Sequence, residues 1–192
     1  MDSPAELEGK TVAVNTVLSL HEVAVRESVK NADADPDEVE FIELSLGEME
    51  AALQSGQADA IATAEPFLGV AMNNGAELIA SQYVDIHPEF IPAMYLATEQ
   101  TTAEDTDLVE QFNTALQRSM EHSTENPEEL RAQLDEFTEI DPGVAEEMIL
   151  TTFGWGLPED TVSRIAEVSA DAGVIDDPDA TAEGLLSYIS GE

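Results

Sequence analysis

Short apolar runs alternate with helix-like segments through the first 80 residues, and this alternation most limits the folds open to the chain. Thr11–Asn15 reads as a strand, and Ser19 and Glu22 then form a capping-box pattern that predicts a helix reaching about Ala32. The alternation continues with predicted strands at 40–44, 58–62 and 77–80 and predicted helices at 48–55 and 66–74. Strands separated by helices indicate an α/β fold with an open, mainly parallel sheet and helices on both faces.

The pattern changes to helices after an extended segment at residues 92–98. Periodicity predicts helices at 104–122, 127–136, 142–151, 158–172 and 178–190, and four of these begin at a proline. Asn126, Asp141 and Asp177 each precede such a proline and suit the N-cap position. We therefore predict two regions, an α/β lobe at residues 8–98 and a helical C-terminal region at residues 99–192.

The charge of the chain restricts its surroundings and its partners. Of 192 residues, 42 are acidic and 6 are basic, yet 43% are hydrophobic, which is too many for a disordered acidic tail. A surface with a formal net charge of -36 repels itself until salt shortens the Debye length to about 3 Å near 1 M. We therefore hypothesise a halophilic protein from a high-salt environment. The same charge argues against nucleic acid and anionic membrane surfaces as partners.

Residue types that support several other functions are missing from the sequence. The chain has no cysteine, so disulfides, thiolate nucleophiles and cysteine-based metal sites are excluded. No run approaches the roughly 20 apolar residues of a membrane span, and no secretion signal follows Met1, so we expect no direct membrane insertion.

Residues 56–67 contain the most informative local pattern, because a run of small residues leads directly into Glu65 and Pro66. Proline suits the first turn of a helix, so this segment predicts a strand-to-helix junction with an acid at its tip. In open α/β sheets small molecules bind outside the carboxyl ends of the strands, where Glu65 would lie. Glu65 could instead serve only the positive end of the helix dipole, and the segment leaves both readings open.

The order and spacing of several motifs resemble a known family of transport proteins. The motifs are Leu7–Asn15, the Ser-capped helix with His21, Asp35–Val39, Gly56–Ala60, Glu65–Phe67, Gly75–Ile79, Tyr95–Thr98, the 112–120 helix, Glu125–Glu129, Thr138–Pro142, Leu157–Glu159 and Ala172–Ile175. Together they resemble the second lobe of ABC-transporter solute-binding proteins of the nitrate, sulfonate and taurine type, over nearly the whole chain.

This resemblance implies a type II periplasmic-binding fold, in which two α/β lobes close over a small solute and present it to an ABC permease subunit. The sequence starts where the second lobe of such proteins starts, so we expect the N-terminal part of lobe one to be missing. Residues 99–192 would then pack on lobe one, and a second chain could supply that lobe. The resemblance also implies an extracellular or cell-surface location for the full-length form.

Carried over to this sequence, the resemblance implies a ligand-binding site made of Asn15, Thr16, Leu18, Ser19 and Glu65. The N-terminus of the helix that opens at Ser19 could bind an anionic group, although Ser19 is equally explained as an N-cap. Glu65 would repel an anion, so an aminopyrimidine-like solute is as well supported as a sulfonate, taurine or nitrate.

Other candidate sites and functions have weaker support. Asp33, Asp35 and Asp37 imitate the start of a calcium loop, but the sixth position is Glu38 rather than Gly. The histidines lack metal-ligand spacing, and for Trp155 we favour core packing over a cleft role. Because no nucleophile or phosphate-loop motif is present, we predict no enzyme, no cofactor and no metal. The alternatives are a ligand sensor or truncated interaction module that does not transport and, with less support, a pyrimidine-metabolising enzyme.

Overall fold

The computed structural model describes residues 1–137 and 140–190, so Thr138 and Glu139 of one quoted motif and the last two residues of the predicted helical region lie outside it. The described chain divides into two compact units. The first unit comprises residues 1–91 and 157–192, and the second unit comprises residues 92–156. The predicted division at residue 98 stays a prediction.

A small parallel sheet forms the centre of the first unit. Its strands are β1 (Thr11–Val14), β2 (Glu40–Glu43) and β3 (Ala60–Ile61), in the order β2-β1-β3. Thr11 pairs with Glu40 across one side of β1, and Val12 pairs with Ala60 across the other. The last three residues of β1 are at most 1% exposed, as expected for the central strand of a sheet covered on both faces.

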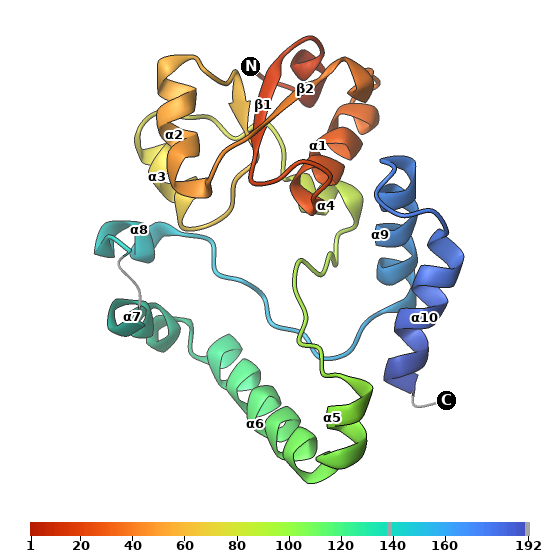
Figure 1. Ribbon diagram of the computed structural model, residues 1–192. Coiled ribbons are helices and arrows are strands. Elements are labelled where there is room, and N and C mark those ends of the chain that lie inside the picture. The colour runs from red at the N-terminus through yellow and green to blue at the C-terminus, as the bar shows by residue number, and fades with distance from the viewer. Residues whose placement is uncertain (138–139, 191–192) are drawn as a thin grey trace. The chain divides into compact units, whose positions relative to one another are not determined.

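Helices α1 (Leu20–Asn31) and α2 (Leu46–Ser55) cover opposite faces of this sheet (Figure 1). Val12 and Val14 point into a cluster with Val25 and Val29 of α1. Ala13, between them, packs with Met49 and Ala52 of α2, as the two-residue period of a strand requires. The predicted fold class, an open parallel sheet with helices on both faces, is therefore confirmed.

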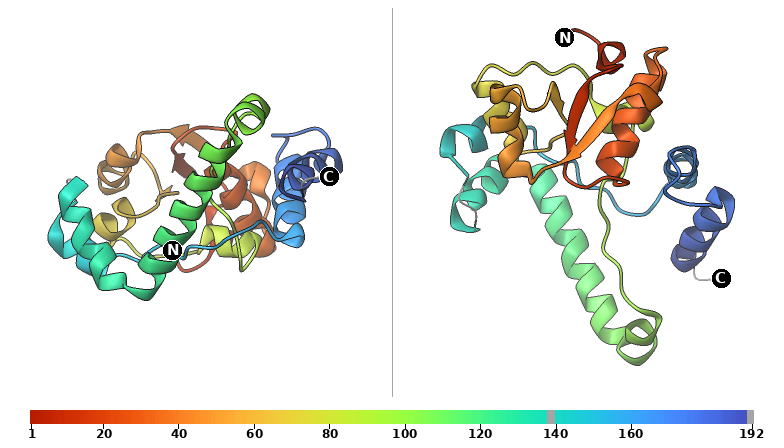
Figure 2. Two further views of the ribbon diagram at one scale, coloured as in Figure 1. Left: turned by 90° about the horizontal axis from the view of Figure 1, so that it is seen from below. Right: turned by 45° about the horizontal axis from the view of Figure 1, so that its top comes forward.

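The remaining elements of the first unit surround this layer structure. They are the 3-10 helices η1 (Pro4–Leu7) and η2 (Pro36–Glu38) and the helices α3 (Phe67–Asn73), α4 (Gln82–Ile86), α9 (Glu159–Asp171) and α10 (Pro178–Ser190). The helices α9 and α10 lie side by side (Figure 2) and share a cluster of Val162, Ala166 and Ala182. Val168 of α9 packs with Val23 of α1 and Ile86 of α4, which joins the C-terminal segment to the α/β part.

The second unit is helical, with α5 (Glu99–Glu104), α6 (Thr106–Glu125), α7 (Pro127–Phe137) and α8 (Pro142–Glu147). Arg131 of α7 donates hydrogen bonds to the carbonyl oxygens of Ala145 (2.6 Å) and Met148 (3.1 Å), which satisfies the C-terminal end of α8. Asp141 accepts a hydrogen bond from the Gly143 N–H before the first turn of α8, so the predicted Asp-Pro cap is confirmed. Trp155 is 55% exposed, so our preference for core packing was wrong.

Several predicted boundaries differ from the structure. The run at 77–80 is not a strand, because no neighbouring strand supplies a hydrogen-bonding partner, and the predicted strand at 58–62 is reduced to β3. The predicted helix at 104–122 corresponds to α6, which begins at Thr106 and ends at Glu125, whereas α5 before it was not predicted. The predicted helix at 142–151 ends at Glu147, and α4 was not predicted at all. Short apolar runs have too little periodicity to separate strand from irregular backbone.

Candidate functional site

The order of the three strands marks one position at the carboxyl edge of the sheet as a candidate ligand site. The connection from β1 to β2 runs through α1 on one face, and the connection from β2 to β3 runs through α2 on the other. The strand order therefore reverses beside β1, between β1 and β3, which is where open α/β sheets bind ligands. The predicted residues Asn15, Thr16, Leu18 and Ser19 follow β1, and Glu65 follows β3, so both groups flank this point.

The loop between β1 and α1 is exposed at its centre. Asn15, Thr16 and Leu18 are exposed, and the Leu18 side chain is 60% accessible. Leu18 has φ 55°, in the left-handed region that a branched apolar residue rarely adopts. An apolar side chain is thus exposed to solvent at this edge, while the Val17 and Leu18 backbone N–H groups hold the loop by hydrogen bonds.

Ser19 is the N-cap of α1 as predicted, but the predicted capping box is wrong. The Ser19 hydroxyl donates to Asn15 Oδ1 (3.2 Å) and caps no helical N–H. Glu22 accepts a hydrogen bond from the Leu18 N–H (2.7 Å) rather than from Ser19. The left-handed backbone at Leu18 turns its N–H toward the first turn of α1, where the Glu22 carboxylate meets it.

Glu22 is buried and anchors the loop from inside. It is 4% exposed, and its second oxygen accepts a hydrogen bond from Arg26 Nε (2.9 Å). Arg26 also donates to Asp37 Oδ1 (3.1 Å) and lies 5.0 Å from the centre of the Phe41 ring. The sequence signal for this role was the spacing of Glu22 and Arg26, because opposite charges four residues apart pair on one face of a helix.

Glu43 is a second site residue that the sequence analysis missed. It is the last residue of β2, and its Oε1 accepts a hydrogen bond from the Val17 N–H (3.1 Å). Its position was readable in principle, because the last residue of a parallel strand beside β1 must lie at the same carboxyl edge.

Glu65 is partly buried at the start of α3, where its Oε2 accepts a hydrogen bond from the Gly69 N–H (3.0 Å). Pro66 is the N-cap of α3, one residue before the helix that we predicted it would begin. The contact with Gly69 agrees with the helix-terminus interpretation of Glu65 and leaves its role toward a solute untested.

Three buried polar atoms near this edge have no hydrogen-bond partner: Thr63 Oγ1, Gln82 Oε1 and His21 Nδ1. Thr63 follows β3, and its carbonyl oxygen accepts a hydrogen bond from Gln82 Nε2 (3.4 Å). His21 is 8% exposed in the first turn of α1, and its ring stacks on Tyr83 at 5.9 Å between centroids. Burial lowers the pKa of His21 and raises the pKa of Tyr83. Buried polar atoms without partners are rare, but these three are closed off from solvent, so a solute at the surface would not reach them.

Basic side chains do not provide an obvious charge partner for a ligand at this edge. The four basic residues of the first unit each pair with an acid, namely Lys10 with Asp59 (3.7 Å), Arg26 with Glu22 (2.9 Å), Lys30 with Asp171 (2.7 Å) and Arg164 with Glu27. Within residues 1–137 and 140–190, no group of three or more His, Asp or Glu side chains could hold a metal ion. The described helices also include none that is long and apolar enough to cross a membrane.

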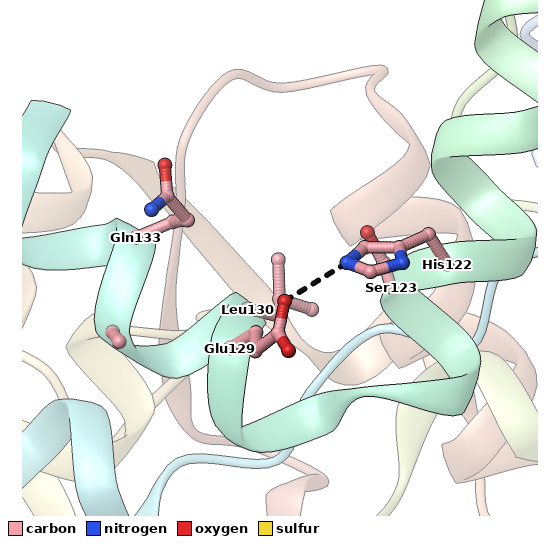
Figure 3. Close-up of a pocket in the computed structure, with 6 residues that line it drawn as sticks. His122, Ser123, Glu129, Leu130 and Gln133 are labelled. Atoms are coloured by element: carbon pink, nitrogen blue, oxygen red, sulfur yellow. Dashed lines mark hydrogen bonds and ion pairs between the residues drawn. The ribbon is translucent and has the colours of Figure 1, made fainter.

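The second unit has a cavity of about 440 Å³ between α6 and α7, lined by His122, Ser123, Glu129, Leu130, Ala132 and Gln133 (Figure 3). His122 Nε2 lies 3.0 Å from Glu129 Oε2 across it, and both side chains are more than 60% exposed. Exposed polar groups that pair with each other are common on protein surfaces and do not by themselves indicate a solute site.

Comparison with known proteins defines the family. Residues 1–130 match the family model described as NMT1/THI5 like, and the chain belongs to this family. Comparison with curated proteins found no significant match.

Solved structures identify the fold more closely. One is the alkanesulfonate-binding protein SsuA from Xanthomonas axonopodis pv. citri bound to MOPS, with a TM-score of 0.75 and 16% identity over 93% of this chain and 63% of that one. Another is the periplasmic aliphatic sulphonate binding protein SsuA from Escherichia coli, with a TM-score of 0.74 and 15% identity over 93% of this chain and 59% of that one.

The chain therefore has the periplasmic-binding fold, and it spans about three fifths of the length of these neighbours. The predicted resemblance to nitrate, sulfonate and taurine-type binding proteins is confirmed. The neighbours are solute-binding proteins rather than enzymes, in agreement with the prediction that the chain is not an enzyme.

Proposed function

We propose that the chain is the solute-binding component of an ABC importer and that it holds a small polar organic solute at the carboxyl edge of its parallel sheet. The observation that carries this proposal is the β2-β1-β3 order, which puts the β1–α1 loop and Glu65 on either side of the reversal point. Asn15, Thr16, Leu18, Ser19 and Glu65 are the proposed contact residues. The names of the two solved neighbours support sulfonates as one solute class to test.

We further propose that the opposing face of the cleft comes from a first lobe, supplied by a further segment or by a second chain. The neighbours are longer than this chain, and α6 of the second unit has no buried residue, so its apolar side chains are available to such a lobe. Closure of two lobes on a solute would then be driven by contacts to both. The other partner would be an ABC permease subunit, at the cell surface or in the periplasm.

The chain has 42 acidic residues and 6 basic ones, and this excess of acid supports a high-salt environment for the protein. A carboxylate-rich surface keeps a chain dispersed where molar salt screens its self-repulsion. We propose on this basis that the protein is halophilic.

The binding function is tested by thermal unfolding of the whole chain in about 1 M KCl with taurine, alkanesulfonates, nitrate and aminopyrimidines. A solute present at 100 times its dissociation constant should stabilise the folded chain by about 2.7 kcal/mol. Glu65→Gln should reduce that gain, whereas Glu77→Gln, which makes the same charge change at an exposed position beyond the other end of α3, should not. Equal stabilisation of both variants would remove Glu65 from the site.

A further inference from the structure

Hydrogen bonds within the first unit hold together the two stretches of chain that lead to and from the second unit. The chain leaves the first unit after residue 91 and returns to it at residue 157. His87 and Glu89 lie just before the first connection, and Asp160 and Thr161 lie just after the second, in the first turn of α9. The ends of both connections therefore meet in one cluster of side chains, which we call the His87 cluster.

The His87 side of this cluster is a tight turn that follows α4. The Phe90 N–H donates to the His87 carbonyl oxygen (3.0 Å), and Pro88 between them has the fixed φ that suits the second position of such a turn. The Glu89 N–H donates to His87 Nδ1 (3.1 Å). Because a backbone N–H can only donate, Nδ1 carries no proton here, and the neutral ring has its proton on Nε2.

The first turn of α9 contacts the same ring. Thr161 is fully buried, and its hydroxyl oxygen lies 3.2 Å from His87 Nδ1 and donates to the Glu89 carbonyl oxygen (3.4 Å). At the other ring nitrogen, Asp160 Oδ2 lies 3.7 Å from His87 Nε2. The His87 side chain is 21% exposed, so water reaches the ring and can exchange protons with it.

The carboxylate that faces the ring is that of Asp160. Other charged groups of the neighbouring helices α1 and α9 pair with each other, Glu27 with Arg164 and Lys30 with Asp171. Tyr83 of α4 stays neutral at physiological pH, because burial raises its pKa, and the His21 ring stacks on Tyr83 rather than on His87. A positive charge on His87 would therefore be stabilised from the α9 side, by Asp160.

Protonation of His87 would exchange its hydrogen-bond partners. Imidazole is the side chain that ordinarily gains a proton between about pH 8 and pH 5. The added proton goes to Nδ1, which then cannot accept the hydrogen bond from the Glu89 N–H. The new Nδ1–H can donate to Thr161 Oγ1 instead, while Nε2–H faces the Asp160 carboxylate. Glu89 is exposed, so its freed N–H can turn to water.

We propose that His87 is a pH-sensitive switch at the connection between the two units. The neutral ring holds the Glu89 amide and with it the turn that leads into the connection at residue 91. The protonated ring binds Thr161 and Asp160 of α9 and releases that amide. This inference does not depend on the proposed solute, because it concerns only the chain segments that join the units.

The test is amide hydrogen exchange together with ¹⁵N NMR of the imidazole rings in the whole chain, with each exchange rate corrected for intrinsic exchange at that pH. At high pH the His87 ring should carry its proton on Nε2. Protection of the Glu89 amide should fall by about 5-fold or more from about pH 8 to about pH 5, as expected for loss of one hydrogen bond. The His87 amide, which donates to the Tyr83 carbonyl oxygen (3.2 Å), should keep its protection.

His87→Asn separates titration from hydrogen bonding. An asparagine side-chain oxygen accepts a hydrogen bond from the N–H two residues on, so this variant keeps an acceptor for Glu89 that does not titrate. Its Glu89 amide should be equally protected at both pH values. His122→Asn makes the same change in the second unit, and His21→Phe removes the other histidine of the first unit. Both control variants should keep the pH dependence of the wild-type chain.

Three results in the wild-type chain would each overturn the inference. They are a neutral ring protonated at Nδ1, Glu89 protection that does not change with pH, and an equal loss at the His87 amide, which would mean that α4 itself opens. A pH dependence that persists in His87→Asn would assign the effect to another group and would overturn it too. If His87→Asn does not fold, the ring and amide signals of the wild-type chain still decide the question.

Discussion

The ion pair between Arg164 of α9 and Glu27 of α1 allows a quantitative prediction about stability. Glu27 is 4% exposed, so Arg164→Met would leave a carboxylate buried without its guanidinium partner. Removing one member of a buried pair costs about 3–5 kcal/mol. The Arg164 side chain is 33% exposed, so water would reach part of the vacated space, and we expect the lower end, about 3 kcal/mol.

Because the chain has two compact units, the loss should be measured where the pair lies. Hydrogen exchange of α1 and α9 amides reports the opening of the first unit directly. A loss of about 3 kcal/mol corresponds to exchange about 100-fold faster at amides that open with this unit. In a thermal scan the same loss should lower the midpoint by about 6–12 °C.

A double variant separates the ion pair from ordinary packing. Glu27→Gln with Arg164→Met removes both charges, so it should recover a large part of the loss seen in Arg164→Met alone. Arg164→Lys is the conservative control, which keeps the positive charge near Glu27. If Arg164→Met costs under about 1 kcal/mol, or if the double variant is no more stable than Arg164→Met, the ion pair does not stabilise the packing of α9 on α1.

Three further outcomes are expected. Burial lowers the pKa of His21, so the unfolded state binds the proton more readily below about pH 6.5. The stability advantage of the wild-type chain over His21→Phe should therefore shrink as pH falls from about 7 to 5. A difference in thermal unfolding midpoint that stays constant with pH would contradict this. The thermal unfolding midpoint should rise between roughly 0.1 and 1 M KCl as the Debye length falls from about 10 to 3 Å. A midpoint that stays constant or falls with salt would count against the halophilic proposal. Met49 is fully buried, so Met49→Ala should cost about 2–5 kcal/mol in urea unfolding, while a loss below about 1 kcal/mol would show that the α2 face is loosely packed.

Long-period patterns in the sequence were enough to predict the fold class, whereas short-range details were not. Helices α1, α9 and α10 each run for three or more turns, and their predicted bounds differ from the structure by one residue or less. The run at 77–80 has a strand-like composition, but only Ile79 packs on the sheet cluster. Pairing with a neighbouring strand decides between strand and irregular backbone, and a single short run does not contain that information.

The sequence predicted only part of the candidate site. The sequence pointed to the residues that follow β1 and β3, because those positions need only the alternation of strands and helices. It missed Glu43 and the role of Glu22, since these depend on which strand lies beside β1 and on the left-handed backbone at Leu18. Ser19 and Glu22 matched a capping box by spacing, yet their side chains bind Asn15 and Leu18 instead.

The composition of the chain and the chemistry of its site have a common cause. With 6 basic residues against 42 acidic ones, the chain has few cations, and those of the first unit are all engaged in pairs such as Arg164 with Glu27 and Lys30 with Asp171, which join α9 to α1. A fold that bound an anion would have to release one of these cations or use amides alone, and here the loop amides hold Glu22 and Glu43. Any positive charge needed to bind a sulfonate would therefore have to come from outside the first unit, either from the second unit or from an opposing lobe.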